Sequence, residues 1–269
     1  MSKMKFSLLD FGELTADQGW FLEASGVWTL SGGYPTKEVR HLQMLGAAIE
    51  HPKHGLILYE VGPVATWKEM WPAPVQQVFA VTKYGKENHL DVQLKKLGYS
   101  LSDVKGIIIG HMHLDHAGGI EHFRGTQVPI YAHEDEIKYA FYAVATKEDF
   151  GAYLPHYIDA SFNWKAIHGN EFEIFEGITL HKTPGHTPGL MAIQVDLKDA
   201  GTFILTSDTF FFGENYYEGH APGWLIRDMA GWRYSLQLIQ NLQLRKNANV
   251  IFGHDIEVFN RFAAEKVYT

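Results

Sequence analysis

A stretch of ten residues, GHMHLDHAGG, constrains this chain more than any other. His111, His113, Asp115 and His116 crowd into six positions between an apolar run and a pair of glycines. The apolar run, VKGIIIG, predicts a buried strand that ends where the histidines begin. Because a strand end is rigid, the loop that leaves it can aim its side chains accurately. The stretch therefore predicts a binding site at the edge of a sheet.

The residue types in this stretch indicate a metal site. In an extended segment, His111 and His113 point to one side and could share a cation. Asp115 and His116 would turn toward a second cation as the chain bends at the glycines. The chain has no cysteine, so its metal ligands must be His, Asp and Glu. Such ligands suit Zn²⁺, with Mn, Fe or Co as alternatives.

Three further strand ends carry one ligand-type residue each. His186 lies in HKTPGHTPG, Asp208 in ILTSDTF and His254 in VIFGHDIE, each after a segment with a strand pattern. A single histidine or aspartate at such a place is usually a cap or a surface residue. Four strand ends of this kind in one chain favour a shared site for two cations.

The hydrophobic pattern predicts strands in groups, with helices between and after them. We expect strands over 55–62, 104–110, 189–197, 202–208 and 248–255, a hairpin over 171–185, and helices over 89–98, 133–150 and 229–247. This order predicts an α+β fold in which two sheets pack face to face with helices outside, a four-layer αββα sandwich. No repeat or low-complexity linker divides the chain, so we expect a single domain over 1–269.

The motifs HMHLDHAGG, TPGHTPG, SDTFFFGENYY and FGHDIE, in this order, resemble those of the metallo-β-lactamase superfamily, and specifically the quorum-quenching N-acyl-homoserine lactonases. The resemblance runs from about Gly55 to Glu257 and implies the αββα fold. It also implies a ligand set, in which one metal is held by His111, His113 and His186, the other by Asp115, His116 and His254, and Asp208 bridges both. Diiron flavoproteins of the superfamily have Glu at the position of His113, and lactamases proper lack the bridging aspartate.

The expected chemistry is hydrolysis at two zinc ions. The carboxylates of Asp115 and Asp208 would neutralise only part of the charge of two zinc ions. Positive charge would therefore remain beside a bound water whose pKa zinc lowers. We expect a hydroxide between the metals to attack a ring carbonyl, and the cations to stabilise the oxyanion that forms. Asp115 or water would carry the proton to the leaving group. By resemblance, the reaction is the ring opening of a lactone, with an N-acyl-homoserine lactone as the leading substrate.

Three alternatives stay open. The first is a hydrolase of lactams or cyclic carbamates, such as benzoxazolinone-like compounds, on the same pair of metals. The second is a thioesterase of the glyoxalase II kind, which TPGHTPG and FGHDIE disfavour. The third is a metal-binding relative without turnover, against which the complete set of seven ligands argues.

Two positions depart from the resemblance. Phe211 stands where such lactonases usually have a tyrosine whose hydroxyl meets the substrate carbonyl, and phenylalanine cannot donate a hydrogen bond. Tyr216 and Tyr217 are candidates to supply that hydroxyl, with ordinary core aromatics as the alternative. Glu60 stands where the superfamily usually has an aspartate, and we expect it to orient a ligating imidazole from behind.

Aromatic residues that could form a substrate pocket gather in three stretches: GWFLEASGVW, ATWKEMWPAP and YAFYAVATKEDFGAYLPHY. An acyl chain or a flat ring needs such a wall. We expect Trp67 or Trp71 to contact substrate, although aromatics also fill cores and dimer contacts.

Composition excludes several classes of partner. The formal net charge of −8 and the lack of a basic run argue against nucleic acid. No apolar stretch approaches the ~20 residues that span a bilayer, and the first residues do not form a convincing secretory signal. We therefore expect a cytoplasmic protein by default, with a small-molecule lactone or lactam as its partner and a homodimer as an open alternative.

Overall fold

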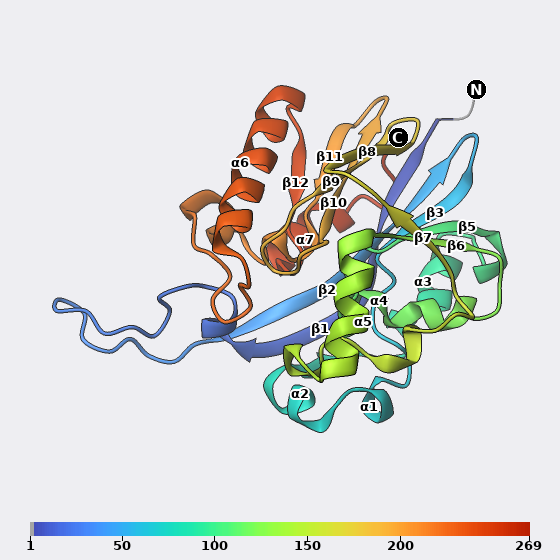
Figure 1. The fold of residues 1–269 in the computed structure, drawn as a ribbon. Helices are drawn as coiled ribbons and strands as arrows, with labels where there is room; N and C mark the ends of the chain where they lie inside the picture. The colour runs from blue at the N-terminus through green and yellow to red at the C-terminus, as the bar shows by residue number, and fades with distance from the viewer. Residues whose placement is uncertain (1–2) are drawn as a thin grey trace.

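The computed structural model describes residues 3–269 and contains two sheets flanked by helices (Figure 1). The strands are β1 (Lys5–Asp17), β2 (Val39–His51), β3 (Gly55–Tyr59), β4 (Ala80–Lys83), β5 (Val104–Ile108), β6 (Pro129–His133), β7 (Asn163–Ile167), β8 (Glu171–Phe175), β9 (Ile178–Lys182), β10 (Met191–Leu197), β11 (Gly201–Leu205) and β12 (Asn249–Ile251). The α-helices are α1 (Trp67–Met70), α2 (Ala73–Val78), α3 (Leu90–Lys96), α4 (Leu114–Ala117), α5 (Glu134–Thr146), α6 (Met229–Lys246) and α7 (Ile256–Ala263).

Both sheets are mixed. The first has the order β4-β1-β2-β3-β5-β6-β7, in which β3, β5, β6 and β7 run parallel. The second has the order β12-β11-β10-β9-β8, in which β12 runs parallel to β11 and the other pairs are antiparallel. Since β9 and β11 both run antiparallel to β10, they are parallel to each other, and β12 is parallel to β11. The carboxyl ends of β9, β11 and β12 therefore lie at one edge of this sheet.

The core has the layers that the αββα arrangement requires. One buried cluster joins the facing sides of the two sheets, with Ile108 of β5 and Ile193 of β10 among its members. A second cluster packs Ile107 of β5 against α2, α3 and α5, and a third packs β10, β11 and β12 against α6. Neighbouring residues of β5 thus point to opposite faces of a sheet that is covered on both sides. The predicted four-layer αββα sandwich is confirmed.

Helix α5 is shorter than the range predicted from its hydrophobic pattern. It starts where His133 Nδ1 accepts a hydrogen bond from the backbone N–H of Asp135, and it carries three acidic residues in its first turn. It ends at Thr146, because Lys147 adopts a left-handed backbone (φ 60°). The remainder of the predicted helix forms a turn and the start of a single 3-10 turn over Asp149–Gly151.

Two long strands and an arm have no counterpart in the sequence-based expectation. β1 and β2 pair antiparallel along almost their whole length. Between them the chain projects from the body as an extended arm, drawn in blue at the left of Figure 1. Within residues 3–269, no helix has both the length and the apolar character needed to cross a bilayer.

Candidate metal centre

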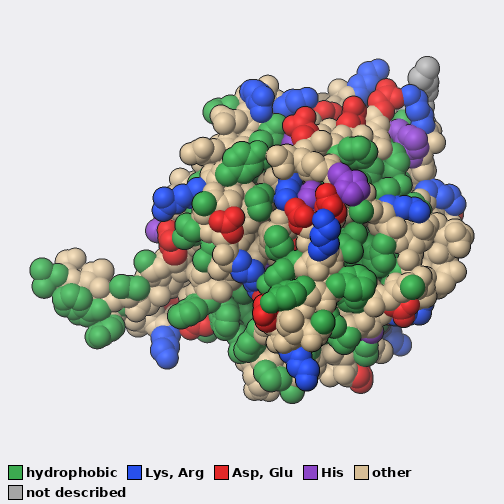
Figure 2. All heavy atoms as spheres, in the orientation of Figure 1, with side chains coloured by type: hydrophobic (Ala, Val, Ile, Leu, Met, Phe, Trp, Pro, Cys, Tyr) green, Lys and Arg blue, Asp and Glu red, His purple; other side chains and the backbone are tan. Residues whose placement is uncertain are grey.

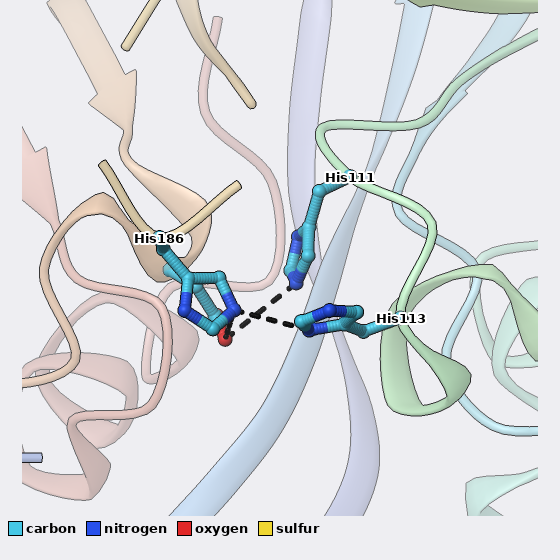
Figure 3. A group of neighbouring side chains, drawn as sticks. His111, His113 and His186 are labelled. Atoms are coloured by element: carbon cyan, nitrogen blue, oxygen red, sulfur yellow. Dashed lines mark hydrogen bonds and ion pairs between the residues drawn. The ribbon is translucent and has the colours of Figure 1, made fainter. Parts of the chain in front are cut away.

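Four loops bring seven histidine and aspartate side chains together at one edge of the sandwich. The loops follow β5, β9, β11 and β12, which are the four strand ends that the sequence singles out. Ligand atoms of His111, His113, His186 and Asp208 lie within 4.8 Å of one another, and so do those of Asp115, His116 and His254. Figure 3 shows three of the imidazoles, from loops on opposite sides of the cluster, converging on one point.

Asp208 lies between the two groups. Its Oδ2 is 3.4 Å from Nε2 of His186 and 3.6 Å from Nε2 of His111. Its Oδ1 is 3.0 Å from Nε2 of His254 and 3.1 Å from Nε2 of His116. One carboxylate oxygen therefore faces each group, which is the arrangement that a bridging ligand needs.

The outer ring nitrogens of the histidines are held by acceptors. Nδ1 of His254 donates to the carbonyl oxygen of Gln43 (2.9 Å), and Nδ1 of His186 donates to that of Leu225 (2.9 Å). Such bonds fix the tautomer and the orientation of an imidazole, leaving Nε2 free to act as a ligand.

Glu60 lies directly behind two further histidines. Its Oε1 accepts a hydrogen bond from the Ser207 hydroxyl (2.8 Å) and is 3.4 Å from Nδ1 of His116. Because the Ser207 proton points to Glu60, Ser207 Oγ is free to accept from Nδ1 of His111 at 3.1 Å. Glu60 has a left-handed backbone (φ 55°), unusual for a residue other than glycine. Its carboxylate is thus positioned to orient His116 directly and His111 through Ser207.

Burial and charge shift the pKa values of these groups in different directions. Burial lowers the pKa of His111 and His113 well below the ordinary value, and neighbouring imidazoles lower it further. Burial also acts to raise the pKa of Asp208, but the imidazoles of His116, His254 and His111 outweigh it and hold this pKa well below the usual range. Burial acts to lower the pKa of His116 as well, but the carboxylates of Asp208, Asp115 and Glu60 outweigh it and hold this pKa well above the ordinary value. The site therefore combines an ionised carboxylate and two imidazoles that favour the neutral form with a third, His116, that favours the protonated form and would exchange its proton for a cation.

Several buried atoms of the cluster have no hydrogen-bond partner among the described residues. They are Nε2 of His111, both ring nitrogens of His116, Oδ1 of Asp208 and Oε2 of Glu60. A buried polar atom without a partner costs free energy, so native structures seldom contain several at one place. Nitrogen and carboxylate donors that face one another without a proton between them fit divalent cations.

A buried carboxylate absent from the sequence-based expectation joins two of the ligand loops. Glu136 of α5 accepts from the backbone N–H of Met112 (2.9 Å) and the Tyr153 hydroxyl (2.8 Å) through Oε1. Through Oε2 it accepts from the Thr187 hydroxyl (2.6 Å) and the backbone N–H of Gly189 (3.3 Å). Burial raises its pKa, and these four bonds oppose the rise. Only its place early in a predicted helix was visible in the sequence.

A cavity of about 190 Å³ opens onto the cluster. Asp115, His113, His186, Asp208 and His254 lie at its polar end. The rest of its wall is mostly apolar and comprises Leu14, Trp20, Phe21, Leu42, Val75, Phe79, Leu114, Phe150, Ala152, Phe211, Trp224 and Leu225, with Asp149 and Arg227 as further polar members. An apolar pocket that ends in a few convergent polar groups is typical of a small-molecule site.

Phe211 lies at the polar end of this cavity. Its ring is 5.5 Å from that of His254, nearly parallel at 13°, and 5.5 Å from that of His186. The first and third aromatic stretches of the sequence also contribute to the wall, through Trp20, Phe21 and Phe150.

The other four aromatic residues expected at the substrate lie elsewhere. Tyr216 is buried against α6, where its hydroxyl donates to Gln243, and Tyr217 is exposed beside it. Neither lines the cavity, so neither replaces the hydroxyl missing at Phe211. Trp67 and Trp71 pack on each other (5.6 Å between ring centroids) in the α1 region, also outside the cavity wall. Periodicity and local spacing do not reveal which aromatic residues of a loop face a distant cavity.

Comparison with known proteins agrees with this architecture. Residues 48–254 match the family described as the metallo-beta-lactamase superfamily. The chain is 27% identical over 266 residues, 95% of each chain, to N-acyl homoserine lactonase AiiB of Agrobacterium fabrum. It is 33% identical over 180 residues, 65% of each chain, to an N-acyl homoserine lactonase of Bacillus cereus.

Solved structures show the same fold. A crystal structure of a Bacillus thuringiensis AiiA variant, with N-decanoyl-L-homoserine bound at the active site, has a TM-score of 0.80 at 24% identity and covers 97% of each chain. AidC, described as a dizinc quorum-quenching lactonase, has a TM-score of 0.67 at 15% identity, covering 95% of this chain and 90% of its own. The matched family spans most of the chain and includes all the strands that carry the His and Asp cluster. The chain belongs to the metallo-beta-lactamase superfamily.

Proposed function

We propose that this protein is a dinuclear metal-dependent hydrolase that opens lactone rings, with N-acyl-homoserine lactones as its leading substrates. The observation that carries the proposal is the buried cluster in which one ionised carboxylate, Asp208, faces four imidazoles at the end of an apolar cavity. The relatives named as N-acyl homoserine lactonases support the choice of substrate.

His111, His113 and His186 would hold one ion, Asp115, His116 and His254 the other, and Asp208 would bridge them. Zinc fits this donor set best, with Mn, Fe or Co as alternatives. Two such ions supply Lewis-acid polarisation of a carbonyl and a water that is acidic at neutral pH.

The protein's own side chains then orient substrate and move a proton. The apolar wall, including Phe21 and Leu42, would bind an acyl chain and keep water away from the scissile bond. Asp115 borders the cavity and is more exposed than Asp208. Its carboxylate would therefore carry a proton to the ring oxygen as the ester bond breaks.

Hydrolysis of a cyclic carbamate or lactam is the second candidate, and Phe211 favours it. The expected tyrosine hydroxyl is missing, and no side chain that lines the described cavity carries a hydroxyl. A flat, ring-fused substrate would also suit a wall rich in aromatic rings.

A metal assay and a substrate panel test the proposal. Protein purified without chelator should contain two equivalents of divalent metal. It should release acid from N-acyl-homoserine lactones of several acyl lengths, and a chelator should abolish the release. Acid release from benzoxazolinone alone would replace the lactonase assignment with the second candidate. Two bound metals without turnover on any substrate would identify a binding protein, and a chain without metal would contradict both candidates.

We also propose that a second copy of the chain covers the projecting arm. The arm exposes Val27, Trp28, Leu30 and Tyr34, and Figure 2 shows hydrophobic side chains gathered on it. An exposed apolar patch of this kind marks an interaction surface. Light scattering should therefore give the mass of a dimer, and Leu30→Glu should shift it toward a monomer. A wild-type monomer at micromolar concentration would contradict this.

A further inference from the structure

An ion pair outside the seven candidate ligands lies against the outer side of His113. Oδ2 of Asp149 is 3.4 Å from Nε2 of this histidine, and its other oxygen pairs with the guanidinium of Arg227. The Asp149 side chain is only 3% exposed. The inner nitrogen of the same ring, Nδ1, faces Nε2 of His186 at 3.0 Å. A carboxylate thus lies behind the ring nitrogen that points away from the cluster.

Arg227 connects this carboxylate to the second histidine. Its Nη1 donates to the carbonyl oxygens of His186 (3.0 Å) and Leu225 (2.9 Å). The Leu225 carbonyl is also the acceptor for Nδ1 of His186. The backbone N–H of Arg227 donates to the carbonyl oxygen of Gly185 (2.9 Å). One guanidinium therefore holds the outer acceptors of both His113 and His186, and its planar fork suits several acceptors at once.

The backbone at Asp149 supports a dedicated role for this pair. Asp149 (φ 62°) and Phe150 (φ 54°) are consecutive residues in the left-handed region, although neither is glycine. Such a conformation persists only where surrounding contacts hold it, and it is concentrated at functional sites. The ion pair with Arg227 is a contact of that kind.

We propose that Asp149 and Arg227 are positioning residues for His113 and His186, and that they set the affinity of one of the two metal positions. By accepting from Nε2 of His113, Asp149 keeps the proton on the outer nitrogen and the Nδ1 lone pair directed at the ion. The other position lies outside this network, because His254 is held by Gln43 and His116 faces Glu60. The inference rests on the proposed function, since it presumes that the cluster binds metal.

Asp149→Asn tests the inference with little change in volume. The amide oxygen can pair with Arg227, but the amide N–H groups then face the protonated nitrogen of His113, which must turn or change tautomer. We expect one of the two ions to bind about 10- to 100-fold more weakly, the usual effect of losing such a partner. The other ion should keep its affinity. Competition with a chromophoric chelator measures both constants, and the visible spectrum of the cobalt-loaded protein should change for one ion only.

Glu214→Gln is the matched control. Glu214 forms a second carboxylate–arginine pair, with Arg40, and neither residue lines the cavity. This variant should bind both ions as the wild type does. If Asp149→Asn fails to fold by circular dichroism, Arg227→Lys provides the same test. It keeps the positive charge but loses the fork, and it should also weaken one ion selectively.

The possible failures are distinguishable. If the wild type binds no metal, the proposed function is wrong. If the wild type binds two ions and a folded variant holds both with wild-type affinity, the positioning role alone is wrong. Equal weakening of both ions would also overturn the inference, because it would indicate a general loss of structure.

Discussion

Phe211→Tyr should create a better lactone hydrolase. The substitution adds a phenolic hydroxyl beside Asp208, His186 and His254, at the polar end of a cavity whose described lining has no hydroxyl. The ring of Phe211 is held between His254 and Phe21, at 5.5 and 5.1 Å. Because these contacts restrict the ring, the new hydroxyl should take a defined position.

The size of the gain follows from what one donor to a developing oxyanion contributes. Removing such a donor typically costs about 10²–10³ in kcat, or ~2.7–4 kcal/mol of transition-state stabilisation. A donor introduced without further adjustment should recover part of this, so we expect kcat to rise about 10- to 100-fold. Because the Phe211 side chain is only 1% exposed, the added hydroxyl is largely removed from water, and the free energy of unfolding should fall by about 1–3 kcal/mol.

A pH-drop assay on purified, metal-loaded enzyme gives kcat and KM for this test. Phe21→Tyr is the control, since Phe21 lines the same cavity and its ring packs against that of Phe211. An unchanged kcat with full metal content would refute the reasoning, because the missing hydroxyl would then not limit the rate. An equal gain in the control would show that polarity in the cavity suffices and that the position does not matter.

Three other outcomes are expected. Chelation should lower the Tm by roughly 8–16 °C, because an ion present at 1,000 times its Kd stabilises by ~4 kcal/mol and a chain of this size loses about 2–4 °C per kcal/mol; calorimetry with and without EDTA measures this. Asp208→Asn should release both ions, as elemental analysis would show, and retention of both would contradict a bridging role. Glu136→Gln should lower the free energy of unfolding by about 2 kcal/mol, because the amide turns its own N–H groups toward two of the four donors. Urea titration checks this, and Glu134→Gln on the same helix, which removes only the partly exposed ion pairs with Lys138 and His168, should change it by less than about 1 kcal/mol.

Local sequence pattern was sufficient to find the strand ends that meet at the cluster. His111, His186, Asp208 and His254 each follow a strand whose apolar pattern is visible within ten residues. Hydrophobic periodicity and turn residues act over such short ranges, so they reveal strands and the loops that leave them. The resemblance to the superfamily supplied the grouping of these residues, which spacing alone left open.

The cavity wall and the partners behind the ligands depended on long-range pairing. Asp149 and Arg227 are 78 positions apart in the sequence. Tyr216 is only eight positions from Asp208, but it packs against α6 and not at the cavity. The two long strands β1 and β2 place Gln43 behind His254, more than 200 residues along the chain. Such contacts arise only when sheets close on one another, because the free energy that selects them comes from burial of the whole core and not from any one segment. The chain thus carries its chemistry in short motifs, while the packing of the two sheets decides what surrounds them.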